Sequence, residues 1–140
     1  MVVVLLIATT LLGVAAASFT DYNERTSARR AAQVFARDLA LARSMAVRGR
    51  EPVTIKFDES GKGYLVTTAG GRVLARRLFG VSAAVALSAV NLNLTGDSLR
   101  FSARGVGTLS GTLGTAVFTA GNVAYQVQFN SLGASTVGEL

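Results

Sequence analysis

The side chains that perform most enzyme chemistry are scarce in this sequence. It contains no histidine and no cysteine, and only eight of its 140 residues are Asp or Glu. Without an imidazole or a thiol, neither a Ser/His/Asp triad nor a Cys/His pair can be assembled, and the commonest zinc ligands are missing. The composition therefore predicts a protein that is not an enzyme and that has no catalytic residues and no cofactor.

The best candidate for a metal site is the adjacent pair Asp58 and Glu59. A calcium loop needs oxygen ligands at alternate positions, whereas the spacing Asp58-x-Ser60-x-Lys62 puts a lysine where a ligand is required. We therefore interpret the pair as solvated carboxylates in a turn, and we predict no metal site.

Basic side chains are more numerous, with 14 Lys and Arg and a net charge of +6. Such an excess favours an anionic membrane surface, a nucleic acid or an acidic partner, and it does not choose between them. The simplest interpretation of the later arginines is a solvated or filament-packing face. If the protein binds DNA instead, the candidate residues are Arg72, Arg76, Arg77, Arg100 and Arg104.

The chain begins with a long apolar segment, since residues 1–19 carry no charged side chain. About 20 such residues are needed to cross a bilayer. We predict a membrane-spanning or filament-core helix, and small residues in it would let neighbouring helices approach closely. A cleaved secretory signal ending near residues 15–17 is an alternative, although it lacks a basic start; a buried helix of a soluble core is another. The residues predicted to form the membrane or filament-core contacts are Val4, Leu5, Leu11, Leu12 and Gly13.

Residues 20–50 continue the helix as an amphipathic segment. Small and apolar residues recur at intervals of three and four, which places them on one stripe, and nothing breaks the pattern before Gly49 and Pro52. We expect Phe35, Leu39, Ala42 and Met45 to pack against the rest of the protein. The charged residues expected mostly off this stripe are Arg29, Arg30, Arg37, Asp38 and Arg43.

After Pro52 the apolar period changes to two, which indicates strands. The sequence predicts a hairpin over residues 53–68, a strand at 72–79 with Val73 and Arg77 on one face, an ambiguous segment at 81–90, a short strand at 99–101 and a last hairpin over 115–129. Together these elements predict an α+β fold, in which a long N-terminal helix packs on an antiparallel β-sandwich-like head. Its three segments are residues 1–19, 20–50 and 51–140.

The order of these segments resembles that of the pseudopilins and minor pilins of the GspH/FimT type. The resemblance covers nearly the whole chain. The stretches that carry it are Ser18-Phe-Thr-Asp-Tyr22, the Leu-, Ala- and Arg-rich residues 31–46, Pro52-Val-Thr-Ile-Lys-Phe57, Leu99-Arg-Phe-Ser-Ala-Arg-Gly105 and Phe129-Asn-Ser-Leu-Gly133.

The sequence departs from the family pattern in three places. The Gly-Phe-Thr-Leu-x-Glu-like prepilin cleavage site is absent and would lie immediately upstream of Met1, so we expect Met1 to be internal or the chain to be truncated. Ala17 stands where many pilins have a proline, which favours an unbroken helix. A Gly-Arg-x-Arg-like tail, used by DNA-uptake relatives, corresponds here to residues 133–136, which contain no arginine.

The resemblance implies a structural subunit of a type IV pilus or of a type II secretion pseudopilus. Its expected partners are other pilin or pseudopilin subunits and, before assembly, the bacterial cytoplasmic membrane, which it would cross once with the head outside the cytoplasm. The alternatives are a DNA-binding minor pilin of natural transformation and a soluble secreted domain left after signal cleavage.

Overall fold

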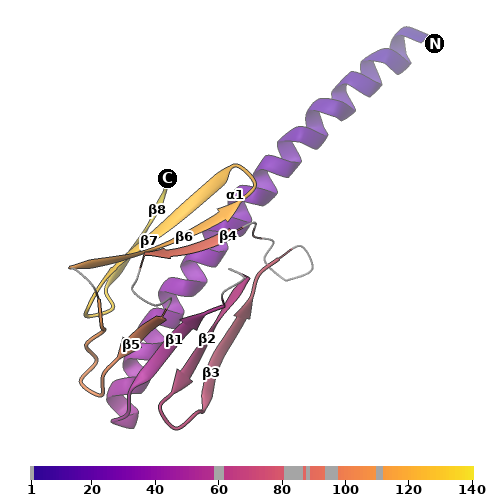
Figure 1. The fold of residues 1–140 in the computed structure, drawn as a ribbon. Coiled ribbons are helices and arrows are strands. Elements are labelled where there is room, and N and C mark those ends of the chain that lie inside the picture. Colours follow the sequence, from indigo (N-terminus) through magenta and orange to yellow (C-terminus); the bar gives the residue numbers. More distant parts are fainter. Residues whose placement is uncertain (1, 59–61, 81–86, 88, 94–97, 110–111) are drawn as a thin grey trace.

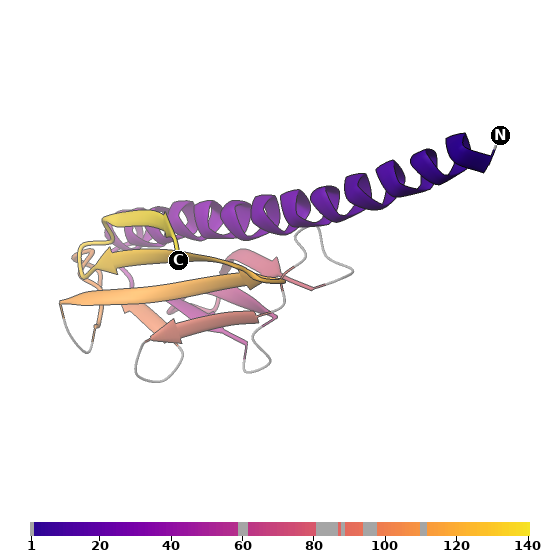
Figure 2. The ribbon, with the colours of Figure 1, turned by 90° about the horizontal axis from the view of Figure 1, so that it is seen from above.

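A single long helix runs the length of the molecule and carries the head on its second half (Figures 1 and 2). The computed structural model describes the backbone of residues 2–58, 62–80, 87, 89–93, 98–109 and 112–140, and the side chains of these residues except 2–21 and 89–93. Helix α1 spans Val2–Gly49. The helix ends at Gly49, and the next residue, Arg50, has a positive φ of 51°. Pro52 follows two residues later.

The head consists of two antiparallel sheets of four strands each. The first sheet has the order β3-β2-β1-β5 and the second has the order β4-β6-β7-β8. The strands of the first sheet are β1 (Val53–Phe57), β2 (Gly63–Thr68), β3 (Val73–Leu78) and β5 (Ser98–Phe101). Those of the second are β4 (Ala89–Asn93), β6 (Leu113–Ala120), β7 (Val123–Asn130) and β8 (Ser135–Glu139).

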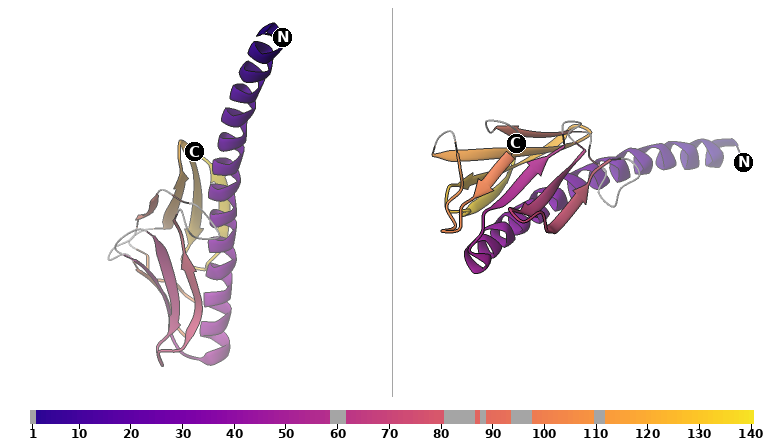
Figure 3. Two further views of the ribbon diagram at one scale, coloured as in Figure 1. Left: turned by 90° about the vertical axis from the view of Figure 1, so that its right-hand side faces the viewer. Right: turned by 60° about the horizontal axis from the view of Figure 1, so that its bottom comes forward.

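The predicted fold class, a long helix packed on an antiparallel sandwich-like head, is confirmed. Both sheets lie against the same side of α1, with their inner faces turned toward it (Figure 3). The centre of the core is Phe35, which is fully buried. Its ring lies 5.4–5.9 Å from the rings of Phe57, Tyr64, Phe118 and Phe129, so that one helical side chain joins residues of both sheets.

The stripe of small residues on α1 lets the sheets approach the helix closely. Five alanines on the head-facing side, together with Phe35 and Leu39, are fully buried. Of the residues expected to pack against the head, Phe35, Leu39 and Ala42 are buried, and Met45 is partly buried against the core. The alanines are Ala28, Ala31, Ala32, Ala42 and Ala46.

Asp38 differs from the sequence-based expectation. It lies on the buried stripe rather than off it, because positions 35, 38 and 42 follow the same three- and four-residue spacing. The predicted faces of the strand at 72–79 also differ: a register shift between Val66 and Thr67 pairs Val73 with Thr67, so Val73 and Arg77 do not share a face. Strand β8 is an addition to the predicted elements, and most of the ambiguous segment at 81–90 lies outside the described residues.

Candidate functional site: the junction of helix and head

The middle of the junction is held by a group of three polar side chains. Asp38 of α1 is only 4% exposed. It accepts a hydrogen bond of 2.8 Å from the hydroxyl of Tyr64 in β2 and two from the guanidinium of Arg77 in β3, at 2.8 Å from Nε and 3.1 Å from Nη2. The helix is thereby bonded to two neighbouring strands at once.

The surroundings of Asp38 favour the protonated forms of both Tyr64 and Arg77. Burial, and next the adjacent Asp38 carboxylate, raise the pKa of the Tyr64 hydroxyl well above its usual value near 10. The hydrogen bonds that Arg77 donates to Asp38 likewise raise the pKa of its guanidinium. Because the phenol keeps its proton and the guanidinium keeps its charge, both remain donors to Asp38 over the whole physiological range of pH.

The C-terminal end of α1 is held by two loops that follow β5 and β7. The amide of Gly107 donates a hydrogen bond of 2.6 Å to the carbonyl of Ser131, which joins the loops. Gly105 has a φ of 76°, and a Cβ there would lie 2.8 Å from Cγ2 of Val47. Gly133 has a φ of 72°, and a Cβ there would lie 3.3 Å from Cδ2 of Leu39. Both glycines therefore allow close contact between loop backbone and helix.

The stretches Leu99–Gly105 and Phe129–Gly133, on which the resemblance partly rests, run from the ends of β5 and β7 into these two loops. The structure brings the two stretches together against the end of α1. This packing gives a structural reason for the glycines at 105 and 133.

The upper end of the junction is held by exposed polar contacts. Glu24 accepts a hydrogen bond of 3.3 Å from the amide of Asn122 in the β6–β7 turn. Gly121 in this turn has a φ of 55°, and a Cβ there would overlap the Glu24 carboxylate. Arg25 lies 3.6 Å from the carboxylate of Glu139 in β8, which also accepts a hydrogen bond of 2.9 Å from Tyr125. That hydrogen bond raises the pKa of the Tyr125 hydroxyl.

The arginines considered for DNA binding do not form one cluster. Arg77 is bonded to Asp38. Arg72 and Arg76 are exposed at the β3 side of the first sheet, whereas Arg100 and Arg104 are exposed at β5 and the loop after it, on the opposite edge. Strand alternation places Arg76, Lys56 and Arg100 on the outer face of this sheet.

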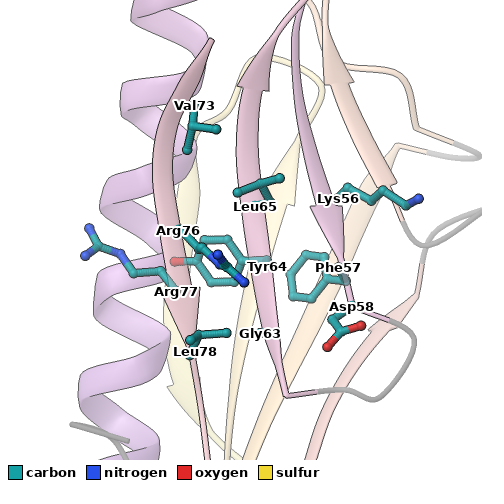
Figure 4. A pocket seen from close by; sticks show the side chains of 10 residues that line it. All are labelled: Lys56, Phe57, Asp58, Gly63, Tyr64, Leu65, Val73, Arg76, Arg77 and Leu78. Carbon is teal, nitrogen blue, oxygen red and sulfur yellow. The ribbon is translucent and has the colours of Figure 1, made fainter. Parts of the chain in front are cut away.

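A hollow lined by described residues lies beside β3 on the outer face of the first sheet (Figure 4). Its volume is about 630 Å³, and Leu65, Val73, Leu78, Lys56 and Arg76 contribute side chains to it. Among the described residues, no three His, Cys, Asp or Glu side chains gather closely enough to hold a metal ion. The hollow thus offers apolar and cationic contacts beside β3, and the carboxylate of Asp58 borders its far side, beyond Gly63.

The residues predicted to form membrane or filament-core contacts, Val4, Leu5, Leu11, Leu12 and Gly13, lie in α1. Their side chains are outside the described part of the structure. Within the residues that are described, no helix is long and apolar enough to cross a membrane.

Comparison with known proteins points to one group of relatives. The family model for the type II transport protein GspH matches residues 31–133. The type IV minor pilin FimU of Pseudomonas aeruginosa is 23% identical, with 86% of this chain and 92% of that one covered, at a TM-score of 0.61. The minor pseudopilin EpsH from the type 2 secretion system of Vibrio cholerae is 14% identical, with 81% and 97% covered, at a TM-score of 0.55. No curated protein matches the sequence.

Proposed function

Because the chain belongs to the family of the type II transport protein GspH, it is a structural subunit of the pilin class, and we propose how it assembles. It is a minor pilin or pseudopilin of a type IV pilus or of a type II secretion pseudopilus. In this proposal the subunit joins the filament through the free half of α1 and contacts its neighbours through the head.

The observation that carries the proposal is that α1 extends far beyond the head (Figures 1 and 3). The first buried side chain among those described is Ala28, although the helix begins at Val2. The first described contacts of α1 with the head are those of Glu24 and Arg25. At 1.5 Å per residue, the preceding residues 2–23 span about 33 Å. A helix of this length without a head to cover it needs another apolar environment, since residues 1–19 carry no charge.

We infer three segments with different tasks. Residues 1–19 anchor the subunit in the cytoplasmic membrane with a single crossing and afterwards pack in the filament core, where helices of sibling subunits replace lipid. Residues 20–50 hold the head, and residues 51–140 form it outside the cytoplasm. Gly13 supports the core packing, since a glycine lets two helices approach closely.

The proposal assigns no catalytic activity to the chain. Its polar side chains at the junction are bonded to each other and hold the helix on the strands. The two arginine-lined edges of the first sheet suggest DNA capture as a second function. It has weaker support, because Arg77 is committed to Asp38 and the other four candidates are divided between opposite edges.

Replacing one apolar residue of the free helix half by a charge tests the assembly. Leu12→Lys places an ammonium group among apolar neighbours, and we expect the amount of subunit in sheared filaments to fall by at least about ten-fold. The matched control is Leu140→Lys, because Leu140 is 67% exposed at the end of the chain. Entry of the Leu12→Lys subunit at the wild-type level would contradict the proposal.

A further inference from the structure

Strand β3 has an open outer edge. The order β3-β2-β1-β5 leaves β3 and β5 at the two ends of the first sheet. The chain covers the β5 edge itself, because Gly107 forms a bridge with Phe101 and Thr108 donates a hydrogen bond of 2.9 Å to Arg100. No described residue pairs with the outer edge of β3 in a comparable way.

The backbone groups that face outward can be identified from the register. Phe79 donates a hydrogen bond to the carbonyl of Lys62, and the pairing of β3 with β2 continues from there in antiparallel register. Hydrogen-bonded and non-hydrogen-bonded pairs alternate along an antiparallel ladder. The N–H and C=O groups of Arg76 and Leu78 therefore point away from β2, and none of the described strands pairs with them.

The side chains along this edge are unusually exposed for a strand. Val73 is 55% exposed and Leu78 is 60% exposed. Arg76 lies between them, and all three border the hollow on the outer face of the sheet, with Lys56 on its far side (Figure 4). A row of apolar, cationic and apolar contacts thus runs beside a row of free backbone groups.

A second copy of β3 is a poor occupant of this edge. Antiparallel pairing centred on Arg76 or on Arg77 would place two arginines directly opposite each other, which is destabilising. The same cations are complementary to carboxylates. The flanking apolar side chains favour a protein strand over a nucleic acid, and no described residue of the hollow provides an exposed aromatic ring on which a base could stack.

We propose that the outer edge of β3 is a docking site for an extended, acidic segment of another protein, which adds to the first sheet as a fifth strand. Main-chain hydrogen bonds to Arg76 and Leu78 hold the segment. Its outward side chains follow the order apolar, acidic, apolar, so that a carboxylate faces Arg76. This inference specifies one of the contacts that the head makes in the proposed function. It rests on that function for one point, that the partner is a neighbouring protein.

Synthetic peptides provide the test, with the full chain in detergent micelles. The probe is a capped peptide of the sequence Thr-Val-Thr-Glu-Thr-Val-Thr. We expect it to shift the amide resonances of Arg76 and Leu78 and to slow their hydrogen exchange, while the amide of Arg77, already in the ladder, changes little. A lysine in place of the glutamate, or methyl groups on the inner amide nitrogens, should weaken binding at least about five-fold.

Two variants of Arg76 separate charge from backbone. Arg76→Glu should weaken binding of the glutamate peptide and strengthen binding of the lysine peptide. Arg76→Pro removes the guanidinium and the outward N–H together, and an edge strand tolerates it. It should weaken binding of the glutamate peptide and, unlike Arg76→Glu, should not be rescued by the lysine peptide. The control is Arg104→Glu, since Arg104 is also exposed but lies beyond the opposite edge, and this variant should bind as wild type does.

Three results would overturn the inference. They are no binding of any peptide, equal binding of the methylated peptide, and salt-sensitive binding of a DNA oligonucleotide in place of the peptide. None of them affects the filament result for Leu12→Lys, so the failure of this docking site is distinguishable from failure of the proposed assembly.

Discussion

Polar contacts attach α1 to the head in two regions, and the two differ in how much water reaches them. In the middle of the junction, the side chains of Asp38 and Arg77 are 5% and 44% exposed and lie 2.8 Å apart, and Asp38 also accepts a hydrogen bond from Tyr64. At the upper end, the side chains of Arg25 and Glu139 are 62% and 42% exposed and lie 3.6 Å apart. Both regions join a residue of the helix to residues of the head.

The difference between the two regions predicts how firmly each one holds. Water and salt screen an exposed ion pair, which typically contributes less than about 1 kcal/mol. A buried carboxylate that loses a partner cannot be rehydrated, so breaking such a group is far more costly. The middle region therefore fixes where the helix sits on the strands, and the upper region adds only a weak constraint near the point where the helix leaves the head.

Removing the cation of the middle region should have the largest effect. Arg77→Ala leaves the Asp38 carboxylate buried with Tyr64 alone, and we expect the free energy of unfolding to fall by about 3–5 kcal/mol. Chemical denaturation of the full chain in detergent, followed by tyrosine fluorescence, measures this. The control is the neighbouring Arg76→Ala, which should change stability by less than about 0.5 kcal/mol. If Arg77→Ala and Arg76→Ala lowered the free energy of unfolding equally, the buried group would hold the helix no more firmly than exposed contacts do.

Removing the phenol hydroxyl of the middle region should have an intermediate effect. Tyr64→Phe keeps the ring and deletes one hydrogen bond to a charged group, which we expect to cost about 1.5–3 kcal/mol. The same denaturation measurement applies. If Tyr64→Phe lowered the free energy of unfolding by less than Arg25→Ala does, burial would not determine how strongly these contacts stabilise the protein.

The pH dependence of the same variant sharpens the comparison. Because the pKa of Tyr64 is raised in the folded state, the protonated phenol stabilises the fold below pH 10, and this contribution is lost as the pH rises further. Between pH 10 and pH 11 the unfolded state gains about 1 kcal/mol from ionising this phenol. Wild-type stability should fall accordingly, and the fall should be smaller in Tyr64→Phe. The raised pKa of Tyr125 also lowers stability as the pH rises, and it does so in both the wild type and Tyr64→Phe.

The upper region should give the smallest effect. We expect Arg25→Ala to lower the free energy of unfolding by less than about 1 kcal/mol, and about 1 M salt should abolish even this difference. Denaturation curves of wild type and variant at low and high salt measure it. A loss that persists at high salt and matches that of Arg77→Ala would contradict the ranking.

Local patterns in the sequence were sufficient for the helix and for most strands. The three- and four-residue spacing of Phe35 and Leu39 follows from helix geometry alone, and both are buried. The alternation in residues 123–129 gave the strand β7 directly. Strand β8 has no clear alternation, and its pairing with β7 is a tertiary effect that no local pattern carries.

The partner of Asp38 was not predictable for a different reason. The spacing of 35, 38 and 42 could have placed this acid on the buried stripe, but its cation lies 39 residues further along the chain. Two adjacent arginines, Arg76 and Arg77, point to opposite faces of β3. The register shift between Val66 and Thr67 puts Val73 on the same face of the sheet as Arg76 and on the opposite face from Arg77. The position of this shift depends on how β2 pairs with β3, which no local pattern shows.

The connectivity of the head has a consequence for the order of events after synthesis. The chain completes β1, β2 and β3 in the first sheet, contributes β4 to the second, returns with β5 to pair with β1, and only then forms β6, β7 and β8. Neither sheet can close before the strands that follow β3 have emerged. Such long-range pairings make folding slow and cooperative. On the proposed route across the cytoplasmic membrane, the head would therefore complete its fold only after nearly all of the chain has crossed.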